Sequence, residues 1–583
     1  MNSEKKLTGY PSIDKPWLKY YSEDAKNTTI PEYTIWEYMY ENNKNNPNDI
    51  ALIYFGKKIS YGELFRNIAK CACALQSIGV KQNEIVTIAL PSIPETLYLV
   101  YALNRIGAVA NMIHPLAGAN EIRDYLNEVE SRFFFMFNTT YNIVATVLEQ
   151  TQVEKNIVIS PAESMQLGIK QLYELKNKKI SLSVDKSCML WSDFFNLGNI
   201  KHFLNCKKNI NSVAIISHTG GTTGEPKGVM VSDMNVNAII VQIGCTLPHR
   251  RQETTLVVLP PFINYSLVNA MLEPLALGFK VALIPEYKPE MFHKYLKQYR
   301  PNHINSIPLY LEALLSNEKL KKMDMSCLIN VVSGGYELNE EKERAINFFI
   351  SERGAQSNIS KGLGSTELTC CATFTYKECN KLGSVGIPLV LNNCKIVDPK
   401  TDDELKYNEI GEICFCSPTL MIGYYKKREA TDAIIKVHDD GKRWIHTGDL
   451  GYITENGIIY IKDRIKRILT TKGNDGIMTK LFPARIENAV LRHSAVKLCC
   501  AIGIPNVERI NIPKVFIVLN NGYYENKQLT ENIIAHCHKF LPDYMVPEVV
   551  EYVNDLPRTE RGKVDYRALE RMAEEQTETI IKN

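Results

Sequence analysis

The chain has 583 residues, of which 45% are hydrophobic and 23% are charged. This length and composition are those of a folded protein with more than one domain, and they exclude a largely disordered chain. The net charge of +3 comes from 68 basic and 65 acidic residues. These residues are mixed along the sequence, so the charge pattern gives no indication of a nucleic-acid partner.

The N-terminal residues and the longest uncharged segment argue against export and against a membrane span. The start, MNSEKKLTGYPS, is polar and lacks the apolar core of a secretory signal. Pro260 and Pro261 interrupt the uncharged residues 254–272, so we expect a buried strand, a turn and a helix there. The 15 cysteines include no CxxC pair, which favours reduced thiols and a cytoplasmic location.

Short apolar runs alternate with amphipathic segments along the chain up to about residue 350. EIVTIALP precedes ETLYLVYALNRIGA, TLVVLPP precedes SLVNAMLEPLALG, and INVVSGG precedes ELNEEKERAINFFI. A repeated strand-then-helix pattern predicts an α/β fold with layers of parallel sheet covered by helices.

The pattern changes near Gly411 to tighter alternation. GEICFCS and RWIHTGDLGYITENGIIYIKDR predict a small β-barrel-like unit, with a hairpin turn at Asn456-Gly457. After Lys466 we expect a helix in PARIENAVLRH, strands in VKLCCAIGIP and KVFIVLN, a helix in TENIIAHCHKFL, and a polar tail. We therefore divide the chain into an N-terminal core, residues 1–464, and a small α+β C-terminal domain, residues 465–583.

The segment ISHTGGTTGEPKGVMVS, residues 216–232, is rich in glycine and hydroxyl side chains around one lysine. Glycines let backbone N–H groups converge on an anion, and Lys227 adds a positive charge, so the loop is suited to phosphate oxygens. Pro226 and Gly228 flank the lysine, which excludes the P-loop pattern GxxxxGK[ST]. A glycine-rich loop is also common as a plain turn, so its role depends on the rest of the chain.

Further motifs follow in a fixed order: ISYGEL (59–64), SGGYEL (333–338), GLGSTE (362–367), GYY (423–425), WIHTGDLG (444–451), DRIKRIL (463–469) and LPRTERGKVD (556–565). Together with the glycine loop they resemble the signature of the AMP-forming, adenylate-forming ligase superfamily. That superfamily includes acyl-CoA synthetases, luciferases and the adenylation domains of peptide synthetases. The resemblance extends from Tyr33 to Glu570 and is closest in type to the acyl-CoA synthetases.

The resemblance implies an enzyme that joins a carboxylate to the α-phosphate of ATP, releases pyrophosphate, and then passes the acyl group to a thiol. The residues that it places around ATP are Thr219, Gly220, Gly221, Thr222, Thr223, Gly224, Lys227, Gly335, Tyr336, Gly362, Leu363, Gly364, Asp449, Ile461 and Arg464. Asp449 would accept from both ribose hydroxyls, and Arg464 would add a donor. Two positions depart from the family pattern: Gly220 replaces a serine, and Leu363 replaces the aromatic residue that stacks on adenine.

The implied catalytic residues are Lys563, Glu367 and Thr366. Lys563 would bridge the carboxylate and the α-phosphate, because cations must offset the repulsion between two anionic reactants. Thr366 would donate to a phosphate. Glu367 and Thr222 would hold Mg²⁺, which prefers oxygen ligands.

The resemblance also implies that the C-terminal domain is mobile, with a hinge at Lys466. Rotation would withdraw Lys563 and bring Gly473 to a channel for the thiol. The turn between Gly473 and Pro483 is longer than the family pattern. It leaves two acceptors open, CoA and the phosphopantetheine of an acyl or peptidyl carrier protein.

The implied substrate pocket consists of Ile263, Asn264, Tyr265, Ser333 and Gly334. Ile263 stands where adenylation domains for α-amino acids carry an acidic residue, so a buried ammonium group would be unpaired there. We therefore expect an apolar acid, either a medium or long fatty acid or a related acyl or aryl acid. Asn264 and Tyr265 could contact the acid or could be polar groups satisfied within the core.

Three functions remain as hypotheses. The first is an acyl-CoA synthetase, and the second is a stand-alone adenylation enzyme that loads a carboxylic or amino acid onto a carrier protein. The third is a nucleotide-binding regulator without catalysis. The presence of Lys227, Glu367, Asp449 and Lys563 together argues against the third.

Overall fold

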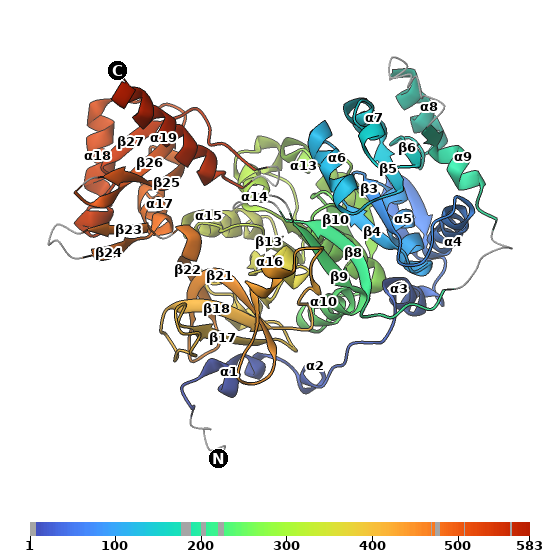
Figure 1. The fold of residues 1–583 in the computed structure, drawn as a ribbon, viewed down its shortest axis with the longest axis horizontal. Coiled ribbons are helices and arrows are strands. Elements are labelled where there is room, and N and C mark those ends of the chain that lie inside the picture. The colour runs from blue at the N-terminus through green and yellow to red at the C-terminus, as the bar shows by residue number, and fades with distance from the viewer. Residues whose placement is uncertain are drawn as a thin grey trace.

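The computed structural model describes residues 7–176, 188–199, 206–219, 227–467, 469–472, 478–506, 508–559 and 563–582. Two large sheets with helices on their faces form most of this structure, and a smaller antiparallel sheet lies beside them (Figure 1). The C-terminal part of the chain forms a separate α+β unit at one side (Figure 1). The predicted α/β class with a small α+β C-terminal domain is confirmed.

The first large sheet has the strand order β19-β9-β8-β4-β3-β5-β6-β7. Its bounds are β3 (Ile85–Ala89), β4 (Val109–Met112), β5 (Phe133–Phe137), β6 (Lys155–Ile159), β7 (Cys188–Leu190), β8 (Val213–His218), β9 (Gly228–Ser232) and β19 (Gly423–Tyr424). Strands β3 to β8 pair in parallel. Strands β8, β9 and β19 pair antiparallel, so the glycine loop connects two neighbouring strands, β8 and β9.

The second large sheet has the order β14-β13-β12-β10-β11-β1-β2. Its bounds are β1 (Ile50–Tyr54), β2 (Lys57–Ser60), β10 (Thr254–Val257), β11 (Lys280–Leu283), β12 (His303–Ser306), β13 (Asn330–Ser333) and β14 (Ser360–Lys361). All of these pairings are parallel except that of β1 with β2. Ser306 and Ser333 pair at the carboxyl ends of β12 and β13, where ligands bind in sheets of this type.

The main helices of this region are α3 (Ile35–Asn43), α4 (Tyr61–Ser77), α5 (Pro94–Arg105), α6 (Ala119–Glu128), α10 (Asp233–Thr246), α13 (Phe292–Tyr299), α14 (Pro308–Leu315) and α15 (Glu340–Ser351). No helix among the described residues combines the length and the apolarity that a bilayer span requires.

One predicted helix has a different local geometry. After β10 the chain forms α11 (Asn264–Ser266), a π-helical segment (Leu267–Leu272) and α12 (Glu273–Ala276), all deeply buried. Pro274 has no N–H to donate to the carbonyl of Ala270, and the helix widens immediately before it. The period of the apolar residues predicted the helix but not the wider turn, and such turns are frequent at functional sites.

The antiparallel sheet consists of β17 (Asn393–Val397), β18 (Gly411–Cys416), β21 (Arg443–Ile453), β20 (Ile435–Val437) and β22 (Ile459–Arg464). Gly457 has a φ of 82° and forms the predicted hairpin turn between β21 and β22. The register of that hairpin pairs Asp449 with Arg464.

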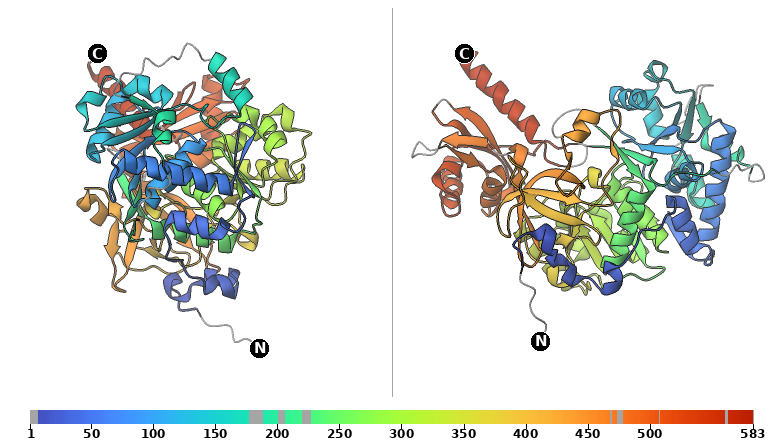
Figure 2. Two further views of the ribbon diagram at one scale, coloured as in Figure 1. Left: turned by 90° about the vertical axis from the view of Figure 1, so that its right-hand side faces the viewer. Right: turned by 60° about the horizontal axis from the view of Figure 1, so that its bottom comes forward.

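The C-terminal part contains β23 (Leu469–Lys472), β24 (Met478–Leu481), α17 (Pro483–Leu491), β25 (Val496–Asn506), β26 (Ile510–Leu519), α18 (Lys527–Cys537), β27 (Val549–Tyr552) and α19 (Tyr566–Lys582). Figure 2 shows this part from two further directions. The prediction of a polar tail was wrong, because residues 566–582 form α19. Leu569 and Ala573 lie one helical turn apart and pack with Phe516 in a buried apolar cluster, which stabilises the helix.

Glu95, in the first turn of α5, is an acid enclosed within the protein core. The Ser164 hydroxyl donates to its Oε1 at 2.5 Å, and burial raises its pKa from 4.5 to about 7. Since the folded pKa lies above the unfolded pKa, ionisation costs folding free energy. The contribution of Glu95 to stability is therefore complete below pH 4.5 and is lost as the pH rises through about 7.

We predict that Glu95→Gln makes the free energy of unfolding less dependent on pH. Between pH 5 and pH 8 the wild-type protein should lose about 3 kcal/mol more than the variant, because glutamine keeps the hydrogen bond and never ionises. Urea unfolding at the two pH values measures the difference. Glu290→Gln, at an exposed position, is the control, and an equal loss in Glu95→Gln and wild type would contradict the prediction.

Candidate active site

The ends of the glycine loop are held together, while its central residues lie outside the described structure. The Thr219 N–H donates to the Lys227 carbonyl at 2.9 Å, and the Lys227 N–H donates to Thr219 Oγ1 at 3.2 Å. These two bonds extend the β8–β9 hairpin to the base of the loop. The predicted ATP contacts that lie outside the described residues are Gly220, Gly221, Thr222, Thr223 and Gly224.

Lys227 and Glu367 meet around Tyr424. The Lys227 Nζ lies 5.0 Å from the centre of the Tyr424 ring, and the Tyr424 hydroxyl donates to Glu367 Oε1 at 2.7 Å. Burial and the Glu367 charge raise the pKa of Tyr424, so its hydroxyl keeps the proton that it donates. The structure thus brings a cation and a carboxylate from distant parts of the chain to the end of the glycine loop.

The segment before Glu367 passes very close to a neighbouring strand. A Cβ on Gly364 would lie 1.9 Å from the Cys370 carbonyl oxygen, and a Cβ on Gly362 would lie 2.3 Å from that of Thr373. Only glycine allows this approach. Leu363, between them, is nearly buried in the apolar core. Thr366 and Glu367 follow in a short 3₁₀ helix, Thr366–Leu368, whose N-cap Ser365 accepts from the Leu368 N–H.

Asp449 is a buried carboxylate with two cationic neighbours. Arg464 Nε contacts Asp449 Oδ1 at 2.9 Å. Burial raises the pKa of Asp449, while the positive charges of Arg464 and Lys563 oppose that rise. Lys563 therefore lies close enough to act on Asp449, although 114 residues separate them. Ile461 lies three residues before Arg464 on β22 and is half-buried.

A second acid holds the part of β21 that precedes Asp449. The Gly448 N–H donates to Glu412 Oε1 at 2.8 Å, and His446 Nδ1 lies 2.8 Å from Glu412 Oε2. Gly448 itself has a φ of 72°, which favours glycine. Glu412 on β18 thus holds His446 and Gly448 of β21, just before Asp449, where the register of the two strands shifts.

The predicted acyl residues gather at the carboxyl ends of β12 and β13. The Tyr265 hydroxyl donates to the Ser306 carbonyl at 3.2 Å, and a Cβ on Gly334 would lie 2.9 Å from the Tyr265 ring. The Ser217 hydroxyl donates to Asn264 Oδ1 at 2.5 Å, which ties this pocket to the strand before the glycine loop. Among the described groups, none accepts from Asn264 Nδ2 or bonds to the Ser333 hydroxyl.

The sequence left open whether Asn264 and Tyr265 contact the acid or are polar groups satisfied within the core, and the hydrogen bonds of the two side chains differ. The Tyr265 hydroxyl is already bonded to the core. Asn264 uses its oxygen in the core but keeps a buried N–H₂ group without a described acceptor. Ile263, the residue before α11, is half-buried against the apolar core.

Gly335 and Tyr336 shape the loop after β13. Gly335 has a φ of 90°, which only glycine adopts without strain. The Tyr336 hydroxyl accepts from the Leu309 N–H at 2.8 Å, and burial raises its pKa. Arg558 of the C-terminal part lies near enough to Tyr336 to oppose that rise.

The turn that carries Lys563 is closed by its own backbone. The Thr559 N–H donates to the Lys563 carbonyl at 2.7 Å. The backbones of Arg558 and Val564 form an isolated antiparallel β-bridge. Of the predicted hinge and channel residues, Lys466 lies in a 3₁₀ helix, Ile465–Arg467, that follows β22. Gly473 lies outside the described residues.

Comparison with known proteins assigns the family. The family model for AMP-binding enzymes matches residues 39–425, and the model for the AMP-binding enzyme C-terminal domain matches residues 485–563. Since the first match covers more than half of the chain, the chain belongs to the AMP-binding enzyme family. The predicted adenylate-forming superfamily is confirmed, and the chain is an enzyme of the AMP-forming ligase type.

Individual relatives cover almost the whole chain. A long-chain-fatty-acid–CoA ligase of Bacillus subtilis is 27% identical over 97% of this chain and 98% of its own length. A probable 4-coumarate–CoA ligase of Dictyostelium discoideum is 27% identical over 94% of this chain and 96% of its own. The crystal structure of an anthranilate–CoA ligase with anthranoyl-AMP has a TM-score of 0.80 at 20% identity, over 95% of this chain and 99% of that chain.

Sequence reasoning gave no role to Tyr424, Glu412 or His446. All three lie in segments that were noted for other reasons, GYY, GEICFCS and WIHTGDLG. The adjacency of His446 to the TGD residues was the available signal for its part in holding Asp449. Nothing in the spacing linked Glu412 to His446, because the strand pairing that joins them forms only in the folded sheet.

We predict that Tyr424→Phe lowers the rate of acid-dependent ATP–pyrophosphate exchange about 10-fold. The change removes the donor to Glu367 but keeps the ring beneath Lys227, so Tyr424→Leu, which removes both, should lower the rate further. Exchange is measured over a series of Mg²⁺ concentrations. Tyr425→Phe, at the neighbouring position, is the control, and an unchanged rate in Tyr424→Phe would contradict the role of the hydroxyl.

Proposed function

We propose that this chain is an ATP-dependent acid–thiol ligase that converts a carboxylic acid to acyl-AMP and then to an acyl-CoA thioester. The observation that carries the proposal is that the buried Asp449 carboxylate, paired with Arg464 at 2.9 Å, is also acted on by the positive charge of Lys563 from the end of the chain, which opposes the rise in pKa that burial causes. A lysine delivered from the C-terminal part to a nucleotide site supplies the charge that the first step requires.

In the first step the acid's carboxylate oxygen attacks the α-phosphorus of ATP, and the bond to the pyrophosphate oxygen breaks. Asp449 would accept from the ribose hydroxyls and orient the nucleotide, while Arg464 holds the carboxylate of Asp449 in place. Lys227 and the backbone N–H groups of the glycine loop would face the leaving pyrophosphate. Lys563 would lie between the two anionic reactants.

The donor set around Glu367 fits Mg²⁺. A carboxylate is the oxygen ligand that Mg²⁺ prefers alongside phosphate oxygens, and Tyr424 fixes one Glu367 oxygen by a hydrogen bond, which orients the group. Thr222 is the second proposed ligand. When bound with ATP, the ion would neutralise phosphate charge, while Thr366 would donate a hydrogen bond to a phosphate oxygen.

In the second step the thiol sulfur attacks the acyl carbonyl carbon and AMP leaves. We propose that residues 465–583 form a domain that rotates about Lys466 between the two steps, with residues 1–464 as the fixed core. A hydrogen bond between the two parts of the chain supports a hinge at this place: the Ala484 N–H of α17 donates to Asp463 Oδ2 of β22 at 3.3 Å. Gly473 would then line the path of the thiol.

The acid is proposed to be largely apolar along its length, as a medium or long fatty acid or an aryl acid would be. Ile263 and the buried wall of β13 support this, because neither offers a charge to pair an α-ammonium group. The names of the relatives agree with the class, since one acts on long-chain fatty acids and another on 4-coumarate.

Loading of a carrier-protein phosphopantetheine is the second candidate function. It is favoured by one observation, the turn after Gly473, which is longer than the family pattern and lies where the thiol would approach.

We expect Lys563→Ala to abolish acid-dependent ATP–pyrophosphate exchange, a loss of at least about 3 kcal/mol of transition-state stabilisation. Thioester formation from supplied acyl-AMP should persist, because that step does not need the lysine. Lys527→Ala, a fully exposed lysine of the same domain, is the matched control. Exchange at the wild-type rate in Lys563→Ala would refute the assignment.

Gly473→Leu should slow transfer to the thiol and spare adenylation. A leucine side chain would obstruct the proposed channel but lies away from the nucleotide. Pyrophosphate exchange and CoA-thioester formation are measured on the same preparation, so each half-reaction controls for the other. An equal loss of rate in both half-reactions would contradict the placement of Gly473 in the channel.

A further inference from the structure

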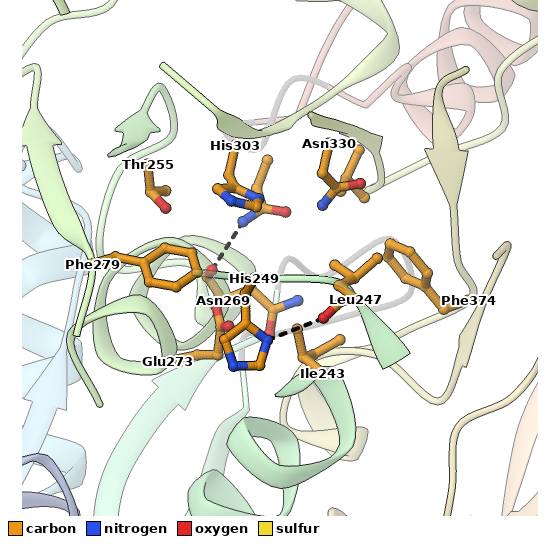
Figure 3. A pocket seen from close by; sticks show the side chains of 12 residues that line it. Ile243, Leu247, His249, Thr255, Asn269, Glu273, Phe279, His303, Asn330 and Phe374 are labelled. Carbon is orange, nitrogen blue, oxygen red and sulfur yellow. Dashed lines mark hydrogen bonds between the residues drawn. The ribbon is translucent and has the colours of Figure 1, made fainter. Parts of the chain in front are cut away.

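A small cavity lies between the second large sheet and the buried helix that follows β10 (Figure 3). Thr255, His303 and Asn330 reach it from β10, β12 and β13, and Asn269 and Glu273 reach it from the helix (Figure 3). Its volume is about 20 Å³, which is room for a group the size of one water molecule.

The cavity adjoins the proposed acyl pocket along the helix that follows β10. Asn305 and Val332 line it from the sheet, on the face opposite to the side chains of the neighbouring Ser306 and Ser333, because side chains alternate along a strand. On the helix side, Asn269 lies one turn beyond Tyr265, and its carbonyl accepts from Asn305 Nδ2 at 2.9 Å. From Ser333 back to Asn330 a strand rises about 10 Å, which is the span available to an acid whose carboxylate lies beside Ser333.

Some of the polar side chains around the cavity lack a described partner, whereas His303 Nε2 lies 2.8 Å from Glu253 Oε2 and Asn305 bonds to the Asn269 carbonyl. Asn269 Oδ1 and Thr255 Oγ1 are buried without a hydrogen bond from any described group. The Glu273 side chain is 6% exposed, and no described donor or acceptor reaches its carboxyl group. Folded proteins pair nearly all such groups, so three unpartnered side chains around one small space indicate a ligand with a hydrogen-bonding group.

A hydrogen bond of the Asn269 side chain fixes the orientation of its amide group. Its Nδ2 donates to Cys371 Sγ at 3.7 Å, which leaves Oδ1 as the acceptor for the cavity. Burial raises the pKa of Glu273 well above its usual range, which favours the neutral acid. A neutral carboxyl group can donate as well as accept, and it offers no charge to an ammonium ion.

We propose that this cavity binds a hydroxyl group at the far end of the carboxylic acid, about 10 Å from the carboxylate that is activated. This inference rests on the proposed ligase function and narrows its substrate to acids with an apolar middle and a terminal hydroxyl. The hydroxyl would donate to Asn269 Oδ1 and accept from the Glu273 carboxyl group. Val332 would contact the apolar part between the two ends.

The test compares acids of equal length that differ only at the far end. The full-length protein is assayed for kcat/KM in acid-dependent ATP–pyrophosphate exchange with 8-hydroxyoctanoate, with nonanoate, in which a methyl group replaces the hydroxyl, and with 8-aminooctanoate. We expect the hydroxy acid to exceed nonanoate by about 10-fold or more, because nonanoate leaves the buried polar groups unpaired. The amino acid should be the poorest of the three.

Variants connect the preference to this cavity. Glu273→Met, of similar volume but without polar atoms, should bring the ratio of hydroxy acid to nonanoate close to one, and Glu273→Gln should retain it. Taking the ratio within each variant cancels any general loss of folding or catalysis. Glu95→Gln, a change at another buried acid outside this pocket, is the control and should keep the wild-type ratio.

Three results would overturn the inference: equal kcat/KM for the hydroxy acid and nonanoate, a preference for 8-aminooctanoate, or a wild-type ratio in Glu273→Met. Failure to turn over any acid would count against the proposed function instead. In that case titration calorimetry of the hydroxy acid and nonanoate against the full-length protein decides the inference. Tighter binding of the hydroxy acid would support it, and equal affinity would overturn it.

Discussion

The buried Asp449 carboxylate, and the cations that offset its burial, are the constraint on which the proposed site depends. A carboxylate removed from water loses its hydration and favours its neutral form, yet ribose recognition requires two accepting oxygens. Arg464 is held opposite Asp449 by the register of β21 and β22, and Glu412 bonds to His446 and Gly448, just before Asp449 on β21. Lys563 adds its charge from the C-terminal part, so its withdrawal in a domain rotation would change the electrostatics of the nucleotide site.

The proposed acyl side of the site follows a different physical rule. It lies between a parallel sheet and a helix that widens into a π-helical turn before Pro274. Most of this helix is apolar and belongs to the core, but Asn269 and Glu273 place polar atoms at the small cavity. Polar atoms at such depth are costly unless they are paired, which is why they inform the choice of substrate more than the surrounding apolar wall does.

Local patterns predicted the elements of the fold well where one face of a segment is buried and periodic. The hairpin at Gly457 and helices α15, α17 and α18 formed where the sequence indicated. The polar tail was wrong because two residues of α19, Leu569 and Ala573, find apolar partners on β25 and β26. The π-helical turn was missed because its apolar residues have the same composition as those of an α-helix.

The sequence by itself determined the family, the α/β class and the identity of the residues proposed for ATP, because short motifs carry the backbone and charge requirements of phosphate binding. Only the tertiary structure decided how these residues are supported: Tyr424 between Lys227 and Glu367, and Glu412 beside His446. It also brought Thr255, Asn269 and Glu273 together around one small cavity. Such contacts join residues far apart in the chain, and strand register and helix packing, which bring them together, form only when the whole core is buried.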